Sequence, residues 1–475
     1  MMKNRFFQAF ACFALLVVSG SCQSFLEVEE KGKTTIPSFL SDPDGLRVAL
    51  VGTYNKVYAY YDNEFTKYPD VAGNMLMVKY ASGQDDGSNM LSQYNFTSDA
   101  SEETGAVGYI WRRIYEALAN ANNLIQYEPA VEQAYPSAAS DCRRMRGEAL
   151  FLRALCHFDL CRVYAQPYNY TPDASHLGIP VLLKTPGPDD NVSRNTVAEV
   201  YEQVLKDLDE AADCLKDASS RGVNYVTMPA VYALRSRVCL YKEDWSSALR
   251  DAEQAIGTLQ VANKEDYQKM FFDLSFDGEA VFRLNGADQS GKLKTFYDTS
   301  VTPADTLYTL FDEGDIRATT LLRAADGTKA CMKYRSQKQP DNQVKRDDPM
   351  VLRVSEIYLN AAEAACHLRQ FDRARNFLSP ILERAVNREY ADGIMADYTD
   401  ARFLDLVKKE RVKELCFEGH NFFDLTRWKQ DLVREASTNS SVKRINYPSD
   451  YFVLPIPQSE LNANQHIQPN PTVNK

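Results

Sequence analysis

Beyond its first residues the sequence has no hydrophobic run that could cross a membrane, since a spanning helix needs about 20 apolar residues and no later segment reaches that length without charges. It also has no basic excess, because the formal net charge is -11. Binding to a phosphate backbone requires clustered positive charge, so no nucleic acid partner is expected. The ten cysteines show no C-x-x-C spacing, which argues against a zinc site.

Motifs for catalysis are also absent from the sequence. There is no G-x-S-x-G elbow, no H-E-x-x-H motif and no phosphate-binding loop. Glu410, Glu414 and Glu418 lie four residues apart on one face of a predicted helix. Paired carboxylates can act as general acid and base, but like charges on one helix face repel each other, so we expect arginines to hold them. The candidate arginines are Arg411, Arg427 and Arg162. We therefore predict no enzyme, no cofactor and no bound metal.

The first residues do form an apolar run, of the kind that directs export. Lys3 and Arg5 precede this run, and small residues then lead to Cys22. That order is typical of a cleaved signal peptide, and small residues that end on a cysteine are typical of bacterial lipoproteins. We predict that residues 1–21 are removed and that Cys22 carries a lipid anchor. The alternative is an ordinary signal peptide with an incidental cysteine.

Helical periodicity dominates the rest of the chain. Residues 144–165 are apolar almost all round, as expected for a helix in the middle of a bundle. Thr196 and Glu199 form a capping box, which marks the start of another helix. We predict that two early helices pair with two later ones. The early helices are 110–126 and 144–165, and the later ones are 196–218 and 400–418.

Two further segments each have the pattern of a helical hairpin. Residues 232–255 and 358–381 align with each other at an offset of 126 residues, with small residues where two helices meet. This pattern is typical of tetratricopeptide-like hairpins. Because single hairpins of this kind cannot bury their apolar faces alone, we predict about four helix pairs stacked into one scaffold.

Three long stretches have little helical period and are rich in Tyr, Asp, Asn, Gly and Pro. Stretches of this length inside a compact protein are usually functional loops, and their aromatic content argues against disorder. They are residues 27–108, 166–195 and 282–350. Within the first, Asp85-Asp86-Gly87-Ser88-Asn89 offers oxygen ligands for calcium or forms a simple polar turn.

Several motifs occur together in the order found in one protein family. They are Trp111 with Tyr115, Phe151-Leu152-Arg153-Ala154, Arg162-Val163-Tyr164, Gly178-Ile179-Pro180, Glu410-Arg411, Glu418-Gly419, Arg427-Trp428 and Leu454-Pro455-Ile456-Pro457. On these motifs the chain resembles the SusD/RagB proteins, surface lipoproteins that partner TonB-dependent transporters in Bacteroidota. It departs from the family pattern at Asn421, where arginine is commoner, and after Pro471, where a glycine is usual.

The resemblance implies a mainly α fold, in which a tetratricopeptide-like scaffold carries long irregular ligand-binding loops. Residues 22–475 would form a single SusD-like domain, with an N-terminal half over about 22–222 and a C-terminal half over about 260–475. The implied protein is lipid-anchored in the outer membrane and exposed at the cell surface. It would bind an oligosaccharide and deliver it to a SusC-like TonB-dependent transporter. The alternatives are a peptide-binding member of the same family and a tetratricopeptide-like scaffold for protein interactions.

In such a protein the ligand is expected to lie over the loops. Trp111, Trp245 and Trp428 all fall in predicted helices, so we assign them to packing and expect ligand contacts from other residues. The wider set is Tyr68, Asp70, Tyr80, Asp86, Asn89, Tyr94, Phe96, Arg283, Phe296 and Tyr297. The ligand-binding residues that we predict from this set are Asp70, Tyr80, Asp86, Tyr94 and Tyr297.

Overall fold

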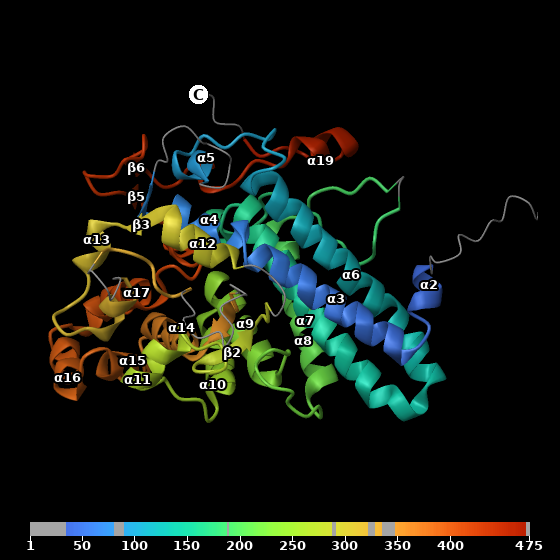
Figure 1. The fold of residues 1–475 in the computed structure, drawn as a ribbon, viewed down its shortest axis with the longest axis horizontal. Coiled ribbons are helices and arrows are strands. Elements are labelled where there is room, and N and C mark those ends of the chain that lie inside the picture. Colours follow the sequence, from blue (N-terminus) through green and yellow to red (C-terminus); the bar gives the residue numbers. More distant parts are fainter. Residues whose placement is uncertain are drawn as a thin grey trace, which may run out of the picture.

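The computed structural model is mainly helical, which confirms the predicted fold class (Figure 1). In the part of the chain that it describes, sheet is limited to three two-stranded sheets. No helix of that part is both long and apolar enough to cross a membrane. The described residues are 35–79, 90–187, 190–286, 291–321, 328–334 and 347–471.

Four long helices form the N-terminal half, and each packs against its neighbours. They are α3 (Pro43–Tyr61), α6 (Ala106–Ala134), α7 (Ala139–Tyr164) and α8 (Val197–Leu215). Helix α7 contacts both α6 and α8, which explains its apolar surface on all sides. The predicted capping box of α8 is present: Glu199 N donates to Thr196 Oγ1 at 3.2 Å, and Thr196 N donates to Glu199 Oε2 at 2.8 Å.

The first stretch predicted to be irregular contains helices, so that prediction is wrong for much of residues 27–108. The helices are α2 (Ile36–Phe39), α3, α4 (Glu64–Ala72) and α5 (Leu91–Tyr94). Asp42 caps α3 by accepting a hydrogen bond from Gly45 N at 2.8 Å. The helical signal of α3 is weak because tyrosine and β-branched residues lower intrinsic helix propensity. Packing against α6 and α7 supplies the stability instead.

The two predicted hairpins are confirmed. They are α9 (Met228–Tyr241) with α10 (Trp245–Ile256), and α14 (Val354–His367) with α15 (Phe371–Ala385). Helix α10 packs on α14, where the rings of Trp245 and His367 stack with centroids 3.7 Å apart. Helix α17 (Asp400–Leu415) also packs mainly on α14, so the predicted pairing of residues 400–418 with an early helix is wrong. Glu414 of α17 bonds to Arg353, which precedes α14, and to Arg384 of α15, so these bonds hold α17 against the second hairpin.

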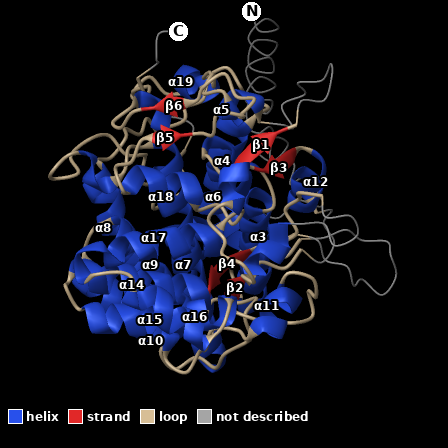
Figure 2. Ribbon diagram, turned by 90° about the vertical axis from the view of Figure 1, so that its left-hand side faces the viewer, coloured by secondary structure: helices blue, strands red, loops and turns tan. Residues whose placement is uncertain are grey.

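The sheets are three short antiparallel pairs of strands, and the first two join segments that lie far apart in the sequence (Figure 2). Their strands are β1 (Leu76–Val78) with β3 (Val301–Pro303), β2 (Ala280–Arg283) with β4 (Met350–Arg353), and β5 (Leu432–Val433) with β6 (Arg444–Ile445). The first sheet holds the segment after α4 against the segment after α12. The remaining α-helices are α11 (Lys264–Met270), α12 (Lys292–Thr299), α13 (Asp305–Tyr308), α16 (Arg388–Ala396), α18 (Asn421–Arg427) and α19 (Gln458–Ala463).

Candidate functional site

A surface cleft of about 470 Å³ lies between α4, α6 and α12. Figure 1 shows α12, in yellow, beside α4. Sites for small ligands usually measure roughly 300–1,000 Å³, so the cleft has room for a small ligand or part of a longer one. The lining side chains that bear on its chemistry are Glu64 and Lys67 of α4, Tyr109 and Arg113 of α6, and Lys292 and Phe296 of α12.

Two buried carboxylates fix the position of α12 by binding its first turn. Asp62, which follows α3, accepts a hydrogen bond from Lys292 N at 3.3 Å, and Asp347 accepts one from Lys294 N at 2.8 Å. Negative charge at a helix N-terminus is favourable. A Cβ on Gly291 would lie 2.7 Å from an Asp347 oxygen, so glycine is needed for this close approach. Burial raises the pKa of both carboxyls, and with the nearby Asp62 charge it raises the pKa of Asp347 to about 8.

Lys67 brings a buried positive charge to one wall of the cleft. Its side chain is only slightly exposed, and Nζ donates to Asn63 Oδ1 at 2.8 Å. Nζ also lies 5.2 Å from the centroid of the Phe296 ring, within the range of a cation–π contact. Burial lowers the pKa of Lys67. The amine is therefore held in place by an amide and a ring, and neither of these carries a compensating negative charge.

Tyr109 and Arg113, which also line the cleft, lie one helical turn apart on α6. The Arg113 guanidinium carbon is 5.1 Å from the Tyr109 ring centroid. Arg113 Nε is buried and has no hydrogen-bond partner among the described residues, and the same is true of Glu64 Oε2. A buried donor or acceptor without a partner costs about 1–3 kcal/mol. A ligand that supplied one acceptor and one donor would satisfy both atoms.

The structure places the predicted site residues away from this cleft or outside what it describes. Asp70 and Tyr297 are each 1% exposed and bond to each other through the tyrosine hydroxyl, and burial raises the pKa of Asp70 to about 7. Tyr94 is fully buried, and its hydroxyl contacts Thr438 at 2.9 Å and Asn439 at 2.8 Å. These three side chains are part of the core packing. Tyr80 and Asp86 lie outside the described residues, as does the Asp85–Asn89 segment.

Of the wider predicted set, Phe296 does line the cleft. The residues that sequence reasoning missed are Glu64, Lys67, Tyr109, Arg113 and Lys292. All five lie on helices, where a charged side chain is usually a solvated surface residue. A signal was available at Tyr109 and Arg113, which lie on one face of a helix at i and i+4.

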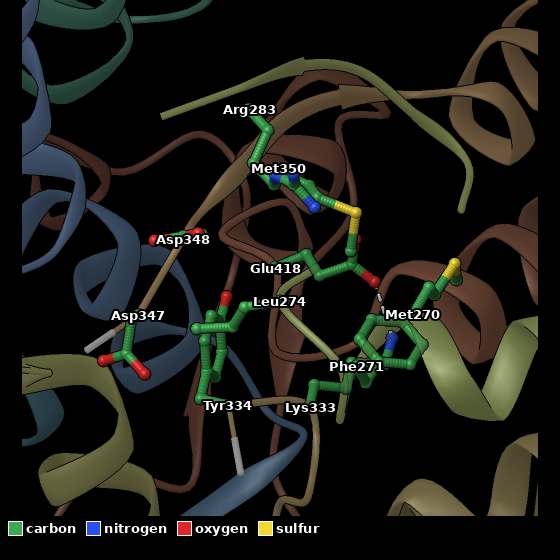
Figure 3. A pocket seen from close by; sticks show the side chains of 10 residues that line it. All are labelled: Met270, Phe271, Leu274, Arg283, Lys333, Tyr334, Asp347, Asp348, Met350 and Glu418. Carbon is green, nitrogen blue, oxygen red and sulfur yellow. Dashed lines mark hydrogen bonds and ion pairs between the residues drawn. The ribbon is translucent and has the colours of Figure 1, made fainter. Parts of the chain in front are cut away.

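A second cavity lies in the interior and has a different character (Figure 3). Its volume is about 30 Å³, which is room for a water molecule and not for a sugar. Figure 3 shows the Glu418 carboxylate directed at Lys333, whose Nζ is 2.6 Å away. Asp347 and Asp348 line the same space. We assign this cavity to the buried charge network of the core.

Glu410 and Glu414 of α17, and Glu418 in the turn after it, belong to that network. Glu410 bonds to Arg317 at 2.7 Å, and Glu414 and Glu418 both bond to Arg353, at 2.8 and 2.6 Å. Burial alone would raise the pKa of Glu414, but three arginines hold it well below its usual range. Pairing with arginine is thus confirmed, with different partners from those predicted.

The three arginines predicted as partners bond elsewhere. Arg411 bonds to Asp424 at 2.7 Å, Arg162 to Asp159 at 2.5 Å, and Arg427 to Glu363 at 2.6 Å. The true partners come from β4 and other segments remote in sequence from α17. Among the described residues no cluster of three or more His, Cys, Asp or Glu side chains could hold a metal ion.

Two family models match the chain. One, described as "SusD family", matches residues 321–472, and the other, described as "Starch-binding associating with outer membrane", matches residues 24–240. Among curated proteins, the SusD-like protein P25 of Formosa agariphila is 20% identical over 96% of this chain and 95% of its own length.

Solved structures of the same superfamily share the fold. A SusD superfamily protein from Bacteroides thetaiotaomicron is 26% identical with a TM-score of 0.80, and the match covers 91% of this chain and all of that one (100%). A SusD-like carbohydrate binding protein from Bacteroides vulgatus is 22% identical, with a TM-score of 0.74 over 90% of this chain and 97% of that one. A laminarin binding SusD-like protein is 20% identical, with a TM-score of 0.71 over 91% and 100%. The chain therefore belongs to the SusD/RagB family.

Proposed function

We propose that this protein binds an oligosaccharide in the cleft between α4, α6 and α12 and passes it to a SusC-like TonB-dependent transporter. The observation that carries the proposal is the cleft itself: it measures about 470 Å³ and contains a buried donor and a buried acceptor that no described residue satisfies. Fold relatives named for carbohydrate and laminarin binding support a glycan as the ligand. The protein would bind its ligand without chemical conversion, because Glu410, Glu414 and Glu418 are all engaged by cations.

Titration of the purified mature protein with glycan and peptide panels tests this proposal. Tyr109→Ala should weaken glycan binding about tenfold, the equivalent of 1.4 kcal/mol, because it removes the ring that supports Arg113. Tyr135→Ala is the matched control, since Tyr135 follows the far end of the same helix and is 41% exposed. Binding of peptides alone, with no effect of Tyr109→Ala on any glycan, would refute the proposed ligand. Shortened glycan products that persist after repurification would refute binding without turnover.

The proposed location depends on Cys22 as the lipid-bearing residue of a mature chain that begins after residue 21. A family described as associating with the outer membrane supports it. Cys22→Ser should move the protein from the membrane fraction to the soluble fraction and leave glycan affinity unchanged, because the anchor contributes affinity only for lipid. Fractionation in a strain without the partner transporter checks this. A variant that stays in the membrane fraction would show that Cys22 is not the anchor.

A further inference from the structure

The cleft differs from the rest of the molecule in how its charges are balanced. Its lining contains three cationic side chains, Lys67, Arg113 and Lys292, and one carboxylate, Glu64, although the whole chain has a net charge of -11. Many buried cations elsewhere are paired with carboxylates: Arg317, for example, bonds to both Asp315 and Glu410. Arg194 differs, since it bonds to carbonyl and amide oxygens such as Gly178 O and Asn470 Oδ1. Within the described segments none of the three cleft cations forms an ion pair.

Three carboxylates act on Lys67, namely Glu64, which lines the cleft, and Asp62 and Asp347, which do not line it. Asp62 and Asp347 lie behind the first turn of α12, where backbone amides take up their oxygens. Burial raises the pKa of both groups, so the pair retains a proton near neutral pH and carries less than its full negative charge. Lys67 has only the neutral Asn63 as a hydrogen-bond acceptor. The cleft therefore presents an excess of positive charge to whatever enters it.

The aromatic rings of the cleft are not free to act as a sugar platform. Stacking of a neutral sugar needs an uncovered ring face. The rings of Phe296 and Tyr109 are each already in contact with a cation. Lys67 Nζ lies 5.2 Å from the Phe296 centroid, and the Arg112 and Arg113 guanidinium carbons lie 5.0 and 5.1 Å from that of Tyr109. The rings support the cations by cation–π contact. This arrangement favours charge over stacking as the means of recognition.

We infer that the ligand of the cleft is an acidic oligosaccharide, which carries carboxylate or sulfate groups. Its anionic group accepts hydrogen bonds from Arg113 and Lys67, and charge-assisted bonds of this kind are about twice as strong as neutral ones. A sugar hydroxyl donates to Glu64 Oε2, which has no partner among the described residues. An anion without hydroxyl groups would leave that carboxylate unsatisfied. The inference rests on the proposed function and names the substrate class of the same cleft.

Matched glycans that differ only in charge test the inference. We would titrate the mature protein by calorimetry with oligogalacturonate and with its methyl ester, and with a sulfated galactan oligosaccharide and its desulfated form. At least one acidic form should bind tenfold or more tightly than its neutral counterpart, and added NaCl should weaken its binding. Whichever acidic form binds identifies the anionic group as carboxylate or sulfate.

Substitutions in the cleft provide the second arm. Lys292→Met and Arg113→Met should each lower affinity for the acidic form about tenfold and affinity for the neutral form much less. Glu64→Gln should raise affinity for the acidic form. Lys292 is exposed, so its variant should fold even if the Arg113 variant does not. Arg112→Met is the matched control, because Arg112 contacts the same Tyr109 ring but does not line the cleft.

The outcomes separate the inference from the proposed function. Equal, salt-independent affinity for acidic and neutral glycans, reduced by Tyr109→Ala, would overturn the inference and leave the proposed function in place. No binding of any glycan would overturn both. Displacement of a bound acidic glycan by peptides of equal or higher affinity would also overturn the inference.

Discussion

Replacing Arg353 with methionine is expected to lower the free energy of unfolding by about 3–5 kcal/mol, because removal of one partner leaves buried charges uncompensated. Arg353 is 1% exposed. Its guanidinium bonds to Glu414 at 2.8 Å, to Glu418 at 2.6 Å and to Glu279 at 3.0 Å. Methionine fills a similar volume but donates no hydrogen bond, so the three carboxylates would share too few cations. Urea unfolding followed by circular dichroism measures the loss as a lower transition midpoint.

The same substitution at the surface is the control. The Arg388 side chain is 70% exposed and bonds to Glu383 at 2.8 Å and to Asp392 at 3.2 Å. Exposed ion pairs contribute about 0–1 kcal/mol, so Arg388→Met should leave the transition midpoint almost unchanged. Arg353→Lys retains the charge with fewer donors and should lie between the wild type and Arg353→Met. Equal midpoints for the Arg353 and Arg388 methionine variants would contradict the role we give to the network.

This network illustrates how far the sequence predicts the fold. The spacing of Glu410, Glu414 and Glu418 is local information, and it correctly predicted that they need cations. It placed all three on one helix, whereas α17 ends at Leu415 and Glu418 lies in the turn that follows. Which cations serve is decided by tertiary packing. Arg353 belongs to β4, whose place is set by pairing with β2, and Arg384 belongs to the second hairpin. Neither relation leaves a pattern in the sequence around α17.

The candidate site was predicted less well, also for physical reasons. Asp70 and Tyr297 were expected in loops, but α4 turns Asp70 inward to meet the Tyr297 hydroxyl, and both become core residues. A polar residue on a short helix gives no local sign of which side faces the interior. Lys67, one turn before Asp70, lines the cleft because α12 packs beside α4. That packing depends on the β1–β3 pairing, which joins Leu76 to Pro303 across almost half of the chain.

Replacing Asp347 with asparagine is expected to stabilise the protein at pH 8 and to have little effect at pH 4. In the unfolded chain an aspartate titrates near pH 4, whereas burial and the Asp62 charge raise the pKa of Asp347 in the folded protein to about 8. Between these values the folded state binds more protons than the unfolded state, so the free energy of unfolding falls as pH rises. Asparagine has no proton to lose, and its Oδ1 can still accept the hydrogen bond from Lys294 N that Asp347 accepts at 2.8 Å.

The difference between variant and wild type is the quantity to measure, because Asp70, whose pKa burial raises to about 7, contributes the same slope to both proteins. Thermal or urea unfolding at intervals from pH 4 to pH 8 should give a stability difference that grows with pH to roughly 5 kcal/mol, since a difference of one pKa unit between the folded and unfolded states contributes about 1.4 kcal/mol. Asp392→Asn, at an aspartate whose side chain is 58% exposed, should give no such growth. Since Asp62 and Asp347 both bind the first turn of α12, glycan affinity of the wild type should also fall above pH 8, as two full charges repel beneath the cleft. A difference that stays constant with pH would mean that Asp347 is ionised throughout, and that α12 is held by two charged carboxylates.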